Sequence, residues 1–372
     1  MLDNRLLWIA LAVLLVAVVV VVVAVRGRDV LEATGLQRRR RPHRDEFRPE
    51  GAEERPRVRY AGVVVNPTKF ADLAAVQARV TAACASHGWG APRWYTTTLA
   101  DPGAGQARAA VADGVDVVCT LGGDGTVRAV AAALVGTETP LGLLGGGTGN
   151  LLGRNLDLPV DHLDRAVAVA LTGQNARIDV GRLEVDSSGQ QDRPNQHIFL
   201  VMAGLGFDAA IMSDAPEQLK ARVGSAAYVV SGFRNFLGPQ FRARIQVSGE
   251  PELSRRTRTV IIGNCGRLFG GLVLMPDAKI DDGLLDTMVL SPRGLVGWTA
   301  VAGHVMTRQR RGHSLIDRHS GSEVRVTTDE PQLVQLDGDL IGTARTLTAT
   351  VDHLALVVRV AATGQPKSAA PQ

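Results

Sequence analysis

Three short apolar segments in the first half of the chain each run directly into a polar or glycine-rich turn. Residues 61–65 precede the turn 66–69, residues 115–120 precede 121–126, and residues 140–144 precede 145–150. Apolar residues at helical spacing follow the first two turns, most clearly in the alanine-rich stretch 127–135. This order predicts buried strands that alternate with helices, and therefore a parallel sheet with right-handed crossovers.

All three turns are expected at one edge of that sheet, because ligands collect beyond the carboxyl ends of parallel strands. The glycines of 121–126 let a phosphate approach the main-chain N–H groups, and the helix that follows presents its positive N-terminal end. Glycine-rich turns containing an aspartate also occur in many α/β loops without a ligand. Three such turns on one edge favour a nucleotide phosphate site over coincidence.

From residue 178 the pattern changes to short runs in which apolar and polar positions alternate. These runs are typical of an antiparallel sandwich or meander. Two helices are expected to interrupt them, near 217–236 and 295–308, and both carry apolar residues over a broad face. Packing on the sheet is the preferred interpretation of these faces, and contact with an acyl chain is the alternative.

The N-terminal residues 6–25 are free of charge and rich in leucine and valine, which is long enough for a transmembrane helix. A cleaved signal peptide is the rival interpretation. Seven arginines and two acidic residues follow between 26 and 44. The positive-inside rule then predicts a single-pass cell-membrane protein with its catalytic domains in the cytoplasm. Three widely spaced cysteines agree with a reducing compartment.

These patterns divide the chain into five parts. We expect an anchor at 1–25, a basic flexible linker at 26–57, an α/β domain at 58–177 to which 341–360 return, a β-rich domain at 178–340, and a disordered tail at 361–372. Only 4% of the residues are aromatic, so stacking platforms for nucleic acid are scarce. The expected partners are a membrane lipid, the bilayer and a second copy of the chain, with no nucleic acid.

The glycine motifs resemble those of a known family. Gly122 to Thr126, followed by Gly147 to Asn150 and preceded by Asn66-Pro67, look like the catalytic domain of the diacylglycerol kinase and sphingosine kinase family of lipid kinases. The more distant NAD kinases and phosphofructokinases share the first motif. The resemblance covers about 58–360 and implies a nucleotide-binding α/β domain with an antiparallel β-sandwich.

By this resemblance, ATP is the cofactor and the first motif holds its phosphates. Thr97 is the nearest match to a threonine that contacts nucleotide in relatives, although Thr96 and Thr98 leave the register open. The implied nucleotide-binding residues are Asn66, Thr68, Thr97, Gly122, Gly123, Asp124, Gly125, Thr126, Thr148 and Asn150.

The resemblance also implies a magnesium site and a catalytic base. Asp282 would bind Mg²⁺ together with the main-chain carbonyls of Lys279 and Leu284, whereas the residues alone predict an ordinary turn there. Asp339 falls on a family glutamate proposed to deprotonate the lipid hydroxyl, and Asp124 would orient Mg²⁺ or the phosphoryl group. Without the family, Asp337-Gly338 predicts a hairpin turn.

Three departures from the family pattern accompany the match. Arg128-Ala129 stands where the family often has Asn-Glu, a family proline is missing from 144–146, and Asp339 is one methylene shorter than glutamate. The sequence therefore favours an ATP-dependent lipid kinase, with diacylglycerol converted to phosphatidic acid. The alternatives are a sphingoid-base or ceramide kinase, an NAD kinase-like enzyme, and a nucleotide-binding membrane regulator without catalysis.

Overall fold

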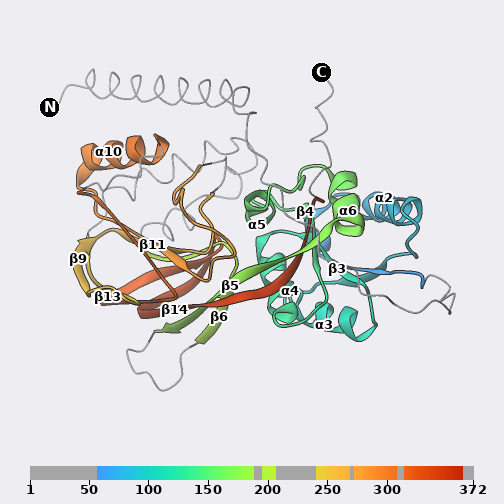
Figure 1. Ribbon diagram of the computed structural model, residues 1–372, viewed down its shortest axis with the longest axis horizontal. Coiled ribbons are helices and arrows are strands. Elements are labelled where there is room, and N and C mark those ends of the chain that lie inside the picture. The colour runs from blue at the N-terminus through green and yellow to red at the C-terminus, as the bar shows by residue number, and fades with distance from the viewer. Residues whose placement is uncertain (1–56, 188–194, 207–239, 269–271, 308–313, 363–372) are drawn as a thin grey trace, which may run out of the picture. The chain divides into compact units, whose positions relative to one another are not determined.

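The computed structural model describes residues 57–187, 195–206, 240–268, 272–307 and 314–362. All of these described residues belong to one compact unit. A single sheet of 14 strands runs through the described part of this unit. Its first section is parallel and lies between helices, and its second section is antiparallel (Figure 1).

The parallel section contains the strands expected from the apolar segments. Its spatial order is β2-β1-β3-β4, and neighbouring strands are parallel in each case. The strands are β1 (Ala61–Val65), β2 (Arg93–Thr96), β3 (Val117–Gly122) and β4 (Leu141–Gly146). The prediction of an α/β domain with a parallel sheet is confirmed.

Helices cover both faces of this section. On one face α2 (Leu73–Ser86) and α6 (Leu163–Thr172) pack on the strands, and on the other α3 (Ala104–Ala112) and α4 (Asp124–Leu134) do so. Successive side chains of a strand face opposite sides of the sheet. Val64 packs in the core under α3 and α4, and Val63 packs in the core under α2 and α6. Two short helices, η1 (Pro67–Lys69) and α5 (Leu151–Asn155), lie in the loops at the sheet edge.

The second section is antiparallel and has its own core. Its strands carry apolar residues at alternate positions, as in β8, where every second residue is buried. Its elements are β6 (Asn195–Phe199), β7 (Met202–Gly206), β8 (Phe241–Val247), β9 (Leu253–Thr257), β10 (Thr259–Gly263), β11 (Leu285–Leu290), β12 (Ile316–Gly321), β13 (Glu323–Leu336) and α10 (Gly294–Met306). The helix expected near 295–308 is α10, whereas the one expected at 217–236 lies outside the described residues.

Two long strands belong to both sections. β14 (Asp339–Val360) pairs with β13 at its start and with β4 near its end, and β5 (Gln174–Asp186) lies antiparallel to it along most of its length (Figure 1). The expected boundary at 177/178 falls within β5. The end of β14 therefore runs beside the parallel section, where Val358 pairs with Leu141, whereas residues 339–350 pair with β13 in the antiparallel section.

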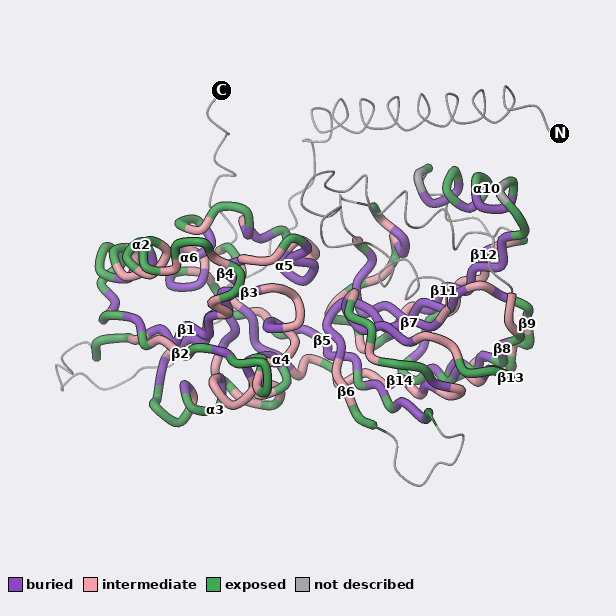
Figure 2. The backbone as a smooth tube through the Cα atoms, turned by 180° about the vertical axis from the view of Figure 1, so that it is seen from behind, coloured by how far each residue is buried: buried purple, intermediate pink, exposed green. Residues whose placement is uncertain are grey.

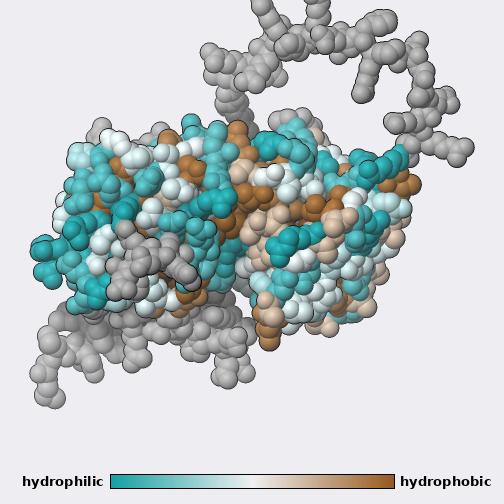
Figure 3. Space-filling model, turned by 90° about the horizontal axis from the view of Figure 1, so that it is seen from below, coloured by the Kyte–Doolittle hydropathy of each residue, from teal (hydrophilic) through white to brown (hydrophobic). Residues whose placement is uncertain are grey.

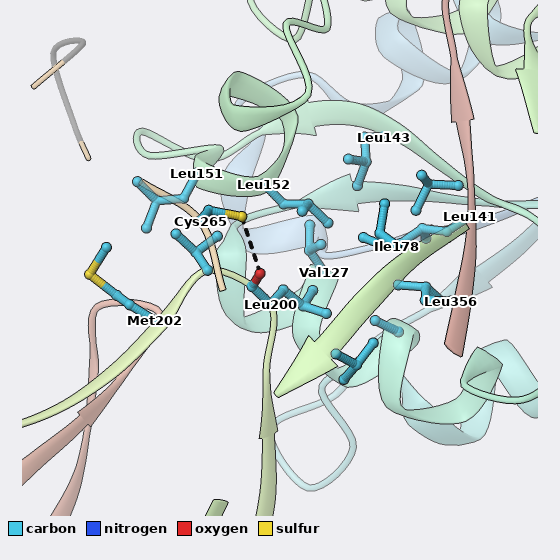
Figure 4. Packing of buried hydrophobic residues seen from close by; sticks show 14 of the residues in the cluster. Val127, Leu141, Leu143, Leu151, Leu152, Ile178, Leu200, Met202, Cys265 and Leu356 are labelled. Carbon is cyan, nitrogen blue, oxygen red and sulfur yellow. Dashed lines mark hydrogen bonds between the residues drawn. The ribbon is translucent and has the colours of Figure 1, made fainter. Parts of the chain in front are cut away.

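The buried apolar residues line these strands from end to end. Figure 2 shows the buried backbone concentrated in the strands of both sections, with exposed residues on the outer helices and turns. In Figure 4, Leu141 and Leu356 pack with Ile178, and Leu200 and Cys265 come from the antiparallel section. The Cys265 thiol donates to the Leu200 carbonyl oxygen at 3.5 Å. A shared core thus fixes β4, β5 and β14 together.

The surface of the described part carries few large apolar side chains. Figure 3 shows hydrophilic and hydrophobic side chains interspersed on one face. The exposed large apolar residues are Val58, Leu99, Leu272, Leu284, Val296 and Leu340. They come from separate elements, so they do not identify an acyl-binding surface.

The prediction of a membrane location is contradicted. No helix in the described part of the chain has both the length and the apolar character needed to cross a bilayer. The longest of these helices, α2, has 14 residues, and a spanning helix needs about 20. Residues 6–25, on which the prediction rested, lie outside the described residues.

A buried carboxylate, Asp179, joins three segments of the shared region. It accepts hydrogen bonds from the Gly283 N–H at 2.7 Å and the Leu354 N–H at 2.7 Å, and it pairs with His353 Nδ1 at 2.8 Å. His353 and Leu354 lie where the pairing of β14 with β5 shifts register, and Leu354 has a φ of 51°. Asp179 thereby satisfies the N–H group at a bulge that no strand neighbour pairs.

We expect Asp179→Ala to lower the free energy of unfolding by about 2–5 kcal/mol, because two partly buried main-chain N–H groups lose their buried acceptor. Urea denaturation followed by circular dichroism measures this loss. Asp164→Ala is the matched control, since Asp164 forms an exposed pair with Arg79 at 2.9 Å. That control should change the free energy by about 1 kcal/mol or less. Equal effects of the two substitutions would refute the role of Asp179.

Candidate nucleotide and phosphoryl-transfer site

The four parallel strands end at the same edge, and a sequence-predicted residue follows each of them. Asn66 follows β1, Thr97 follows β2, Gly123 follows β3 and the loop of Thr148 follows β4. The Asn66 N–H donates to the Leu121 carbonyl at 3.0 Å, and the Thr97 N–H donates to the Val65 carbonyl at 2.9 Å. These bonds hold the loops of neighbouring strands side by side at the sheet edge.

The turn of residues 122–126 is tightly closed around its glycines. A Cβ on Gly122 would lie 2.8 Å from Thr126 Oγ1, so the buried threonine requires a glycine there. At Gly123 the nearest atoms to such a Cβ are Lys69 Cε at 3.8 Å and Gly147 Cα at 3.9 Å. Space therefore remains in front of Gly123, at the N-terminus of α4, where an anion is favoured by N–H groups and the helix dipole.

The second glycine loop packs against the first. A Cβ on Gly147 would lie 2.7 Å from Gly123 Cα, and Gly146 has a φ of 120° that favours glycine. Asn150 is buried, and its side chain accepts from the Gly147 N–H at 3.1 Å and donates to the Gly147 carbonyl at 2.9 Å. Asn150 thus closes this loop from within, while Thr148 is exposed at its tip.

Asn66 has a similar structural function in the loop after β1. Its side-chain oxygen accepts from the Thr68 N–H at 3.1 Å and from the Thr68 hydroxyl at 2.8 Å. This arrangement caps the short helix η1. Thr68 and Lys69 are both exposed at the edge.

Asp124, the first residue of α4, links the two glycine loops. Its Oδ1 accepts from the Leu151 N–H at 2.6 Å. The side chain lies beside a small void lined by the apolar residues Val127, Leu143 and Val160. Burial, with smaller contributions from the charges of Asp337 and Asp339, raises the pKa of Asp124 to about 6.

The turn between β13 and β14 brings two more carboxylates to the same place. Asp337 and Gly338, with φ angles of 47° and 94°, form the two-residue hairpin turn that the sequence predicts. The Asp337 carboxylate is buried and accepts from the N–H groups of residues 200, 201 and 202 at 2.8–3.3 Å. Burial raises its pKa, against the opposing effects of Arg128 and of these N–H groups.

Asp339 lies against the glycine turn. A Cβ on Gly125 would be 3.1 Å from Asp339 Oδ2. The same oxygen accepts from Arg128 Nη2 at 2.8 Å, and more than half of the Asp339 side chain is exposed. The hairpin and the phosphate-type turn are therefore in contact although they lie more than 200 residues apart in sequence.

Two cations at this site are absent from the residues that the sequence analysis assigns to it. Lys69 lies at the opening in front of Gly123, and Arg128 lies between Asp337 and Asp339. Arg128 is four residues after Asp124, so it shares a face of α4 with it. That spacing is the signal that would have placed Arg128 in the site.

The residues predicted to bind Mg²⁺ lie on the turn before β11, and their role stays a prediction. Asp282 is exposed, and its Oδ1 accepts from the Leu284 N–H at 3.1 Å, as in an ordinary turn. Burial raises the pKa of nearby Asp286, and the charges of Asp282 and Asp277 raise it further. This concentration of negative charge, with carbonyl oxygens close by, suits a hard cation such as Mg²⁺.

The fold combines a parallel section, whose strands end in glycine-rich turns suited to phosphate, with an antiparallel section that resembles a β-sandwich. A family model described as the diacylglycerol kinase catalytic domain matches residues 61–183. A second model, described as the YegS C-terminal NAD kinase beta sandwich-like domain, matches residues 201–360.

Similar proteins of known name agree with both models. A probable lipid kinase YegS-like from Pseudomonas aeruginosa is 34% identical over 236 residues, which cover 62% of this chain and 72% of the relative. A diacylglycerol kinase from Staphylococcus saprophyticus is 28% identical over 67% of this chain and 78% of the relative. The match to an Enterobacter YegS-like protein, at 33% identity, spans 49% of this chain and only 59% of that relative.

A solved structure confirms the fold. The crystal structure of a diacylglycerol kinase from Bacillus anthracis superimposes with a TM-score of 0.61 at 20% identity, covering 83% of this chain and 98% of that one. The chain belongs to the diacylglycerol kinase catalytic-domain family of lipid kinases. The family implies the use of ATP.

The raised pKa of Asp124 predicts a pH-dependent stability. Its folded-state pKa of about 6 exceeds the ordinary value of 3.8, so the native state holds this proton more tightly than the unfolded state. The free energy of unfolding should therefore fall as the pH rises from about 4 to 6. Asp124→Asn keeps an acceptor for the Leu151 N–H and removes the charge.

We expect this variant to be more stable than wild type by about 1–3 kcal/mol above pH 6. The two proteins should differ little at pH 4, where Asp124 is protonated. Urea denaturation at pH 4.5, 5.5 and 7.5 measures the difference. A variant that is less stable than wild type at pH 7.5 would contradict this account.

Proposed function

We propose that this chain is an ATP-dependent lipid kinase that transfers the γ-phosphate of ATP to a lipid hydroxyl, with diacylglycerol as the preferred acceptor and phosphatidic acid as the product. The observation that carries the proposal is the contact of the Asp339 carboxylate with Gly125. It supports a role for this carboxylate as the proton acceptor, beside a turn whose N–H groups and helix end are suited to phosphate.

The nucleotide phosphates would bind at the edge formed by the turns 122–126 and 145–150. The α4 N-terminus and the Lys69 ammonium would offset their negative charge, and Thr68, Thr148 and Thr97 would line the remainder of the nucleotide site. Asn66 and Asn150 act from within the loops, whose shape they hold. Catalysis by such a site consists mainly of positioning and charge stabilisation.

In the transfer step the lipid hydroxyl oxygen attacks the γ-phosphorus in line with the bond to ADP. A new oxygen–phosphorus bond forms, the bond to the leaving oxygen breaks, and ADP departs with that electron pair. Asp339 would accept the hydroxyl proton. Asp124, through the Leu151 N–H, would keep the two glycine loops in register around the phosphates.

Divalent cations fit two places in this proposal. Mg²⁺ bound with ATP would supply positive charge to the phosphates, and Asp124 is the carboxylate that would orient it. A second, structural ion would be held by Asp282 and the carbonyl oxygens of Lys279 and Leu284. The neighbouring carboxylates of Asp277 and Asp286 favour a cation there.

One observation supports a second candidate, a nucleotide-binding regulator without catalysis. Asp339 is already paired with Arg128 at 2.8 Å, and an ion-paired carboxylate is a weaker proton acceptor than a free one. Sphingoid bases, ceramide and NAD are alternative acceptors within the enzyme class. The exposed apolar residues of the described part do not select among them.

The experiment that tests the proposal measures phosphate transfer from γ-labelled ATP to acceptors in mixed micelles. Diacylglycerol, ceramide, sphingosine and NAD are offered separately, with ATP binding measured by calorimetry in parallel. Label in phosphatidic acid is the expected result. ATP binding with no labelled lipid would refute the lipid kinase proposal and favour the regulator.

Two substitutions at the site have different expected effects. Asp124→Ala should abolish turnover, because it separates the two glycine loops that bind phosphate. Asp339→Asn should lower kcat by about 100-fold or more, the usual contribution of a general base, and leave ATP affinity unchanged. Initial rates and ATP titrations measure both effects. Asp164→Asn, at an exposed ion pair, is the control that should retain wild-type rates.

Full activity of the Asp339 variant would remove this residue from the mechanism. Loss of ATP binding in the same variant would instead assign Asp339 to the nucleotide site.

A further inference from the structure

Arg128 connects α4 to the hairpin that carries Asp339. Its Nη1 donates to the Leu336 carbonyl at 2.8 Å and lies 3.7 Å from Asp337 Oδ2, while its Nη2 donates to Asp339 Oδ2 at 2.8 Å. Only 18% of the Arg128 side chain is exposed. The guanidinium therefore makes polar contacts on both of its arms.

The first arm has fixed partners. Leu336 is the last residue of β13, and the carboxylate of Asp337 is 3% exposed and held by three backbone N–H groups. The planar guanidinium is rigid, so anchoring Nη1 also sets the position of Nη2. Asp339, in contrast, is 55% exposed, and its carboxylate is paired with Arg128.

The charges around Arg128 are mostly negative. Asp124 lies on its own helix, Asp337 and Asp339 face it from the hairpin, and His197 faces it from β6. Burial and the charge of Arg128 lower the pKa of His197, so that ring is neutral at pH 7 and adds no positive charge. Arg128 is thus the cation that Asp337 and Asp339 share.

We propose that Arg128 is a positioning residue that holds the Asp339 carboxylate against the first turn of α4, beside the glycine turn of residues 122–126. This inference rests on the lipid kinase function proposed above. It explains how an aspartate on an exposed turn reaches a fixed place beside Gly125. Under this proposal Asp339 accepts the proton and Arg128 keeps it in place.

Two other roles are consistent with the same location. If Arg128 instead bound the ATP phosphates directly, its loss would raise the KM for ATP. If Arg128 only linked α4 to the hairpin, its loss would lower the free energy of unfolding and would not lower kcat specifically. These roles differ from positioning in measurable ways.

The test combines Arg128→Gln with Asp339→Asn in a double-mutant cycle. Arg128→Gln alone should lower kcat by about 10- to 100-fold, as displacement of a catalytic group by about 1 Å does, with the KM for ATP unchanged. In the Asp339→Asn background the same substitution should lower kcat by less than about twofold, because the group it positions is gone. Arg128→Lys keeps the charge but loses the planar guanidinium with its two donating arms, so its kcat should lie between those of Arg128→Gln and wild type.

Arg79→Gln is the matched control. Arg79 forms an exposed pair with Asp164 at 2.9 Å on the α2 and α6 side of the sheet, and its loss should leave kcat and KM at wild-type values. Additive losses in the double variant, or a raised KM for ATP, would overturn the positioning role. Equal rates for Arg128→Gln and wild type would overturn it as well.

The ion pair can be observed without substrate. Nitrogen-15 NMR of the Arg128 guanidinium should show slower rotation of the Nη2 group in wild type than in Asp339→Asn, where Nη1 keeps its partners Leu336 and Asp337. If wild type binds ATP but phosphorylates no lipid, the kinase proposal fails, and restricted rotation then identifies the pair as a structural link only. If wild type is active and the rotation is the same in both proteins, the kinase proposal stands and the positioning role is refuted.

Discussion

The buried carboxylate of Asp337 is the constraint on which the site depends. A hairpin turn of two residues exposes N–H and C=O groups at its tip, and this tip is inserted beside residues 200–202, whose own N–H groups need acceptors. Asp337 supplies the acceptor, and its N–H donates in return to the Met202 carbonyl at 2.8 Å. With the turn fixed in this way, Asp339 is two residues from a rigid point and meets Gly125.

Asp179 has a related function about 30 residues after the second glycine loop. Both carboxylates are buried, both accept from main-chain N–H groups rather than from a lysine or arginine alone, and both lie where regular strand pairing is interrupted. Because an unpaired buried N–H costs about 1–3 kcal/mol, a carboxylate that pairs two or three of them stabilises an irregular backbone. The long strands β5 and β14 can therefore bend from one section of the sheet into the other.

The sequence predicts those parts of the structure that depend on neighbouring residues. The strand, glycine turn and helix around Asp124 and the hairpin at Asp337-Gly338 follow from local patterns, and the structure contains both. The contact between Arg128 and Asp339 joins residues 211 positions apart, and no local pattern encodes it. The partner of Asp124, the Leu151 N–H, is a main-chain group that carries no residue-type signal. The membrane prediction rested on residues 6–25 and the arginines that follow them, which lie outside the described residues, and no described helix is long and apolar enough to cross a bilayer.

The charge of Asp124 is difficult to explain by structure alone. An asparagine would accept the same hydrogen bond from Leu151 without the desolvation that raises the pKa of Asp124 to about 6. The negative charges of Asp337 and Asp339 repel the Asp124 carboxylate and raise its pKa further. A group that destabilises the fold at neutral pH, at a site otherwise suited to anions, is best explained by a requirement for negative charge. A cation that arrives with the phosphate meets that requirement, because it would relieve the repulsion among the carboxylates and neutralise the phosphate at once.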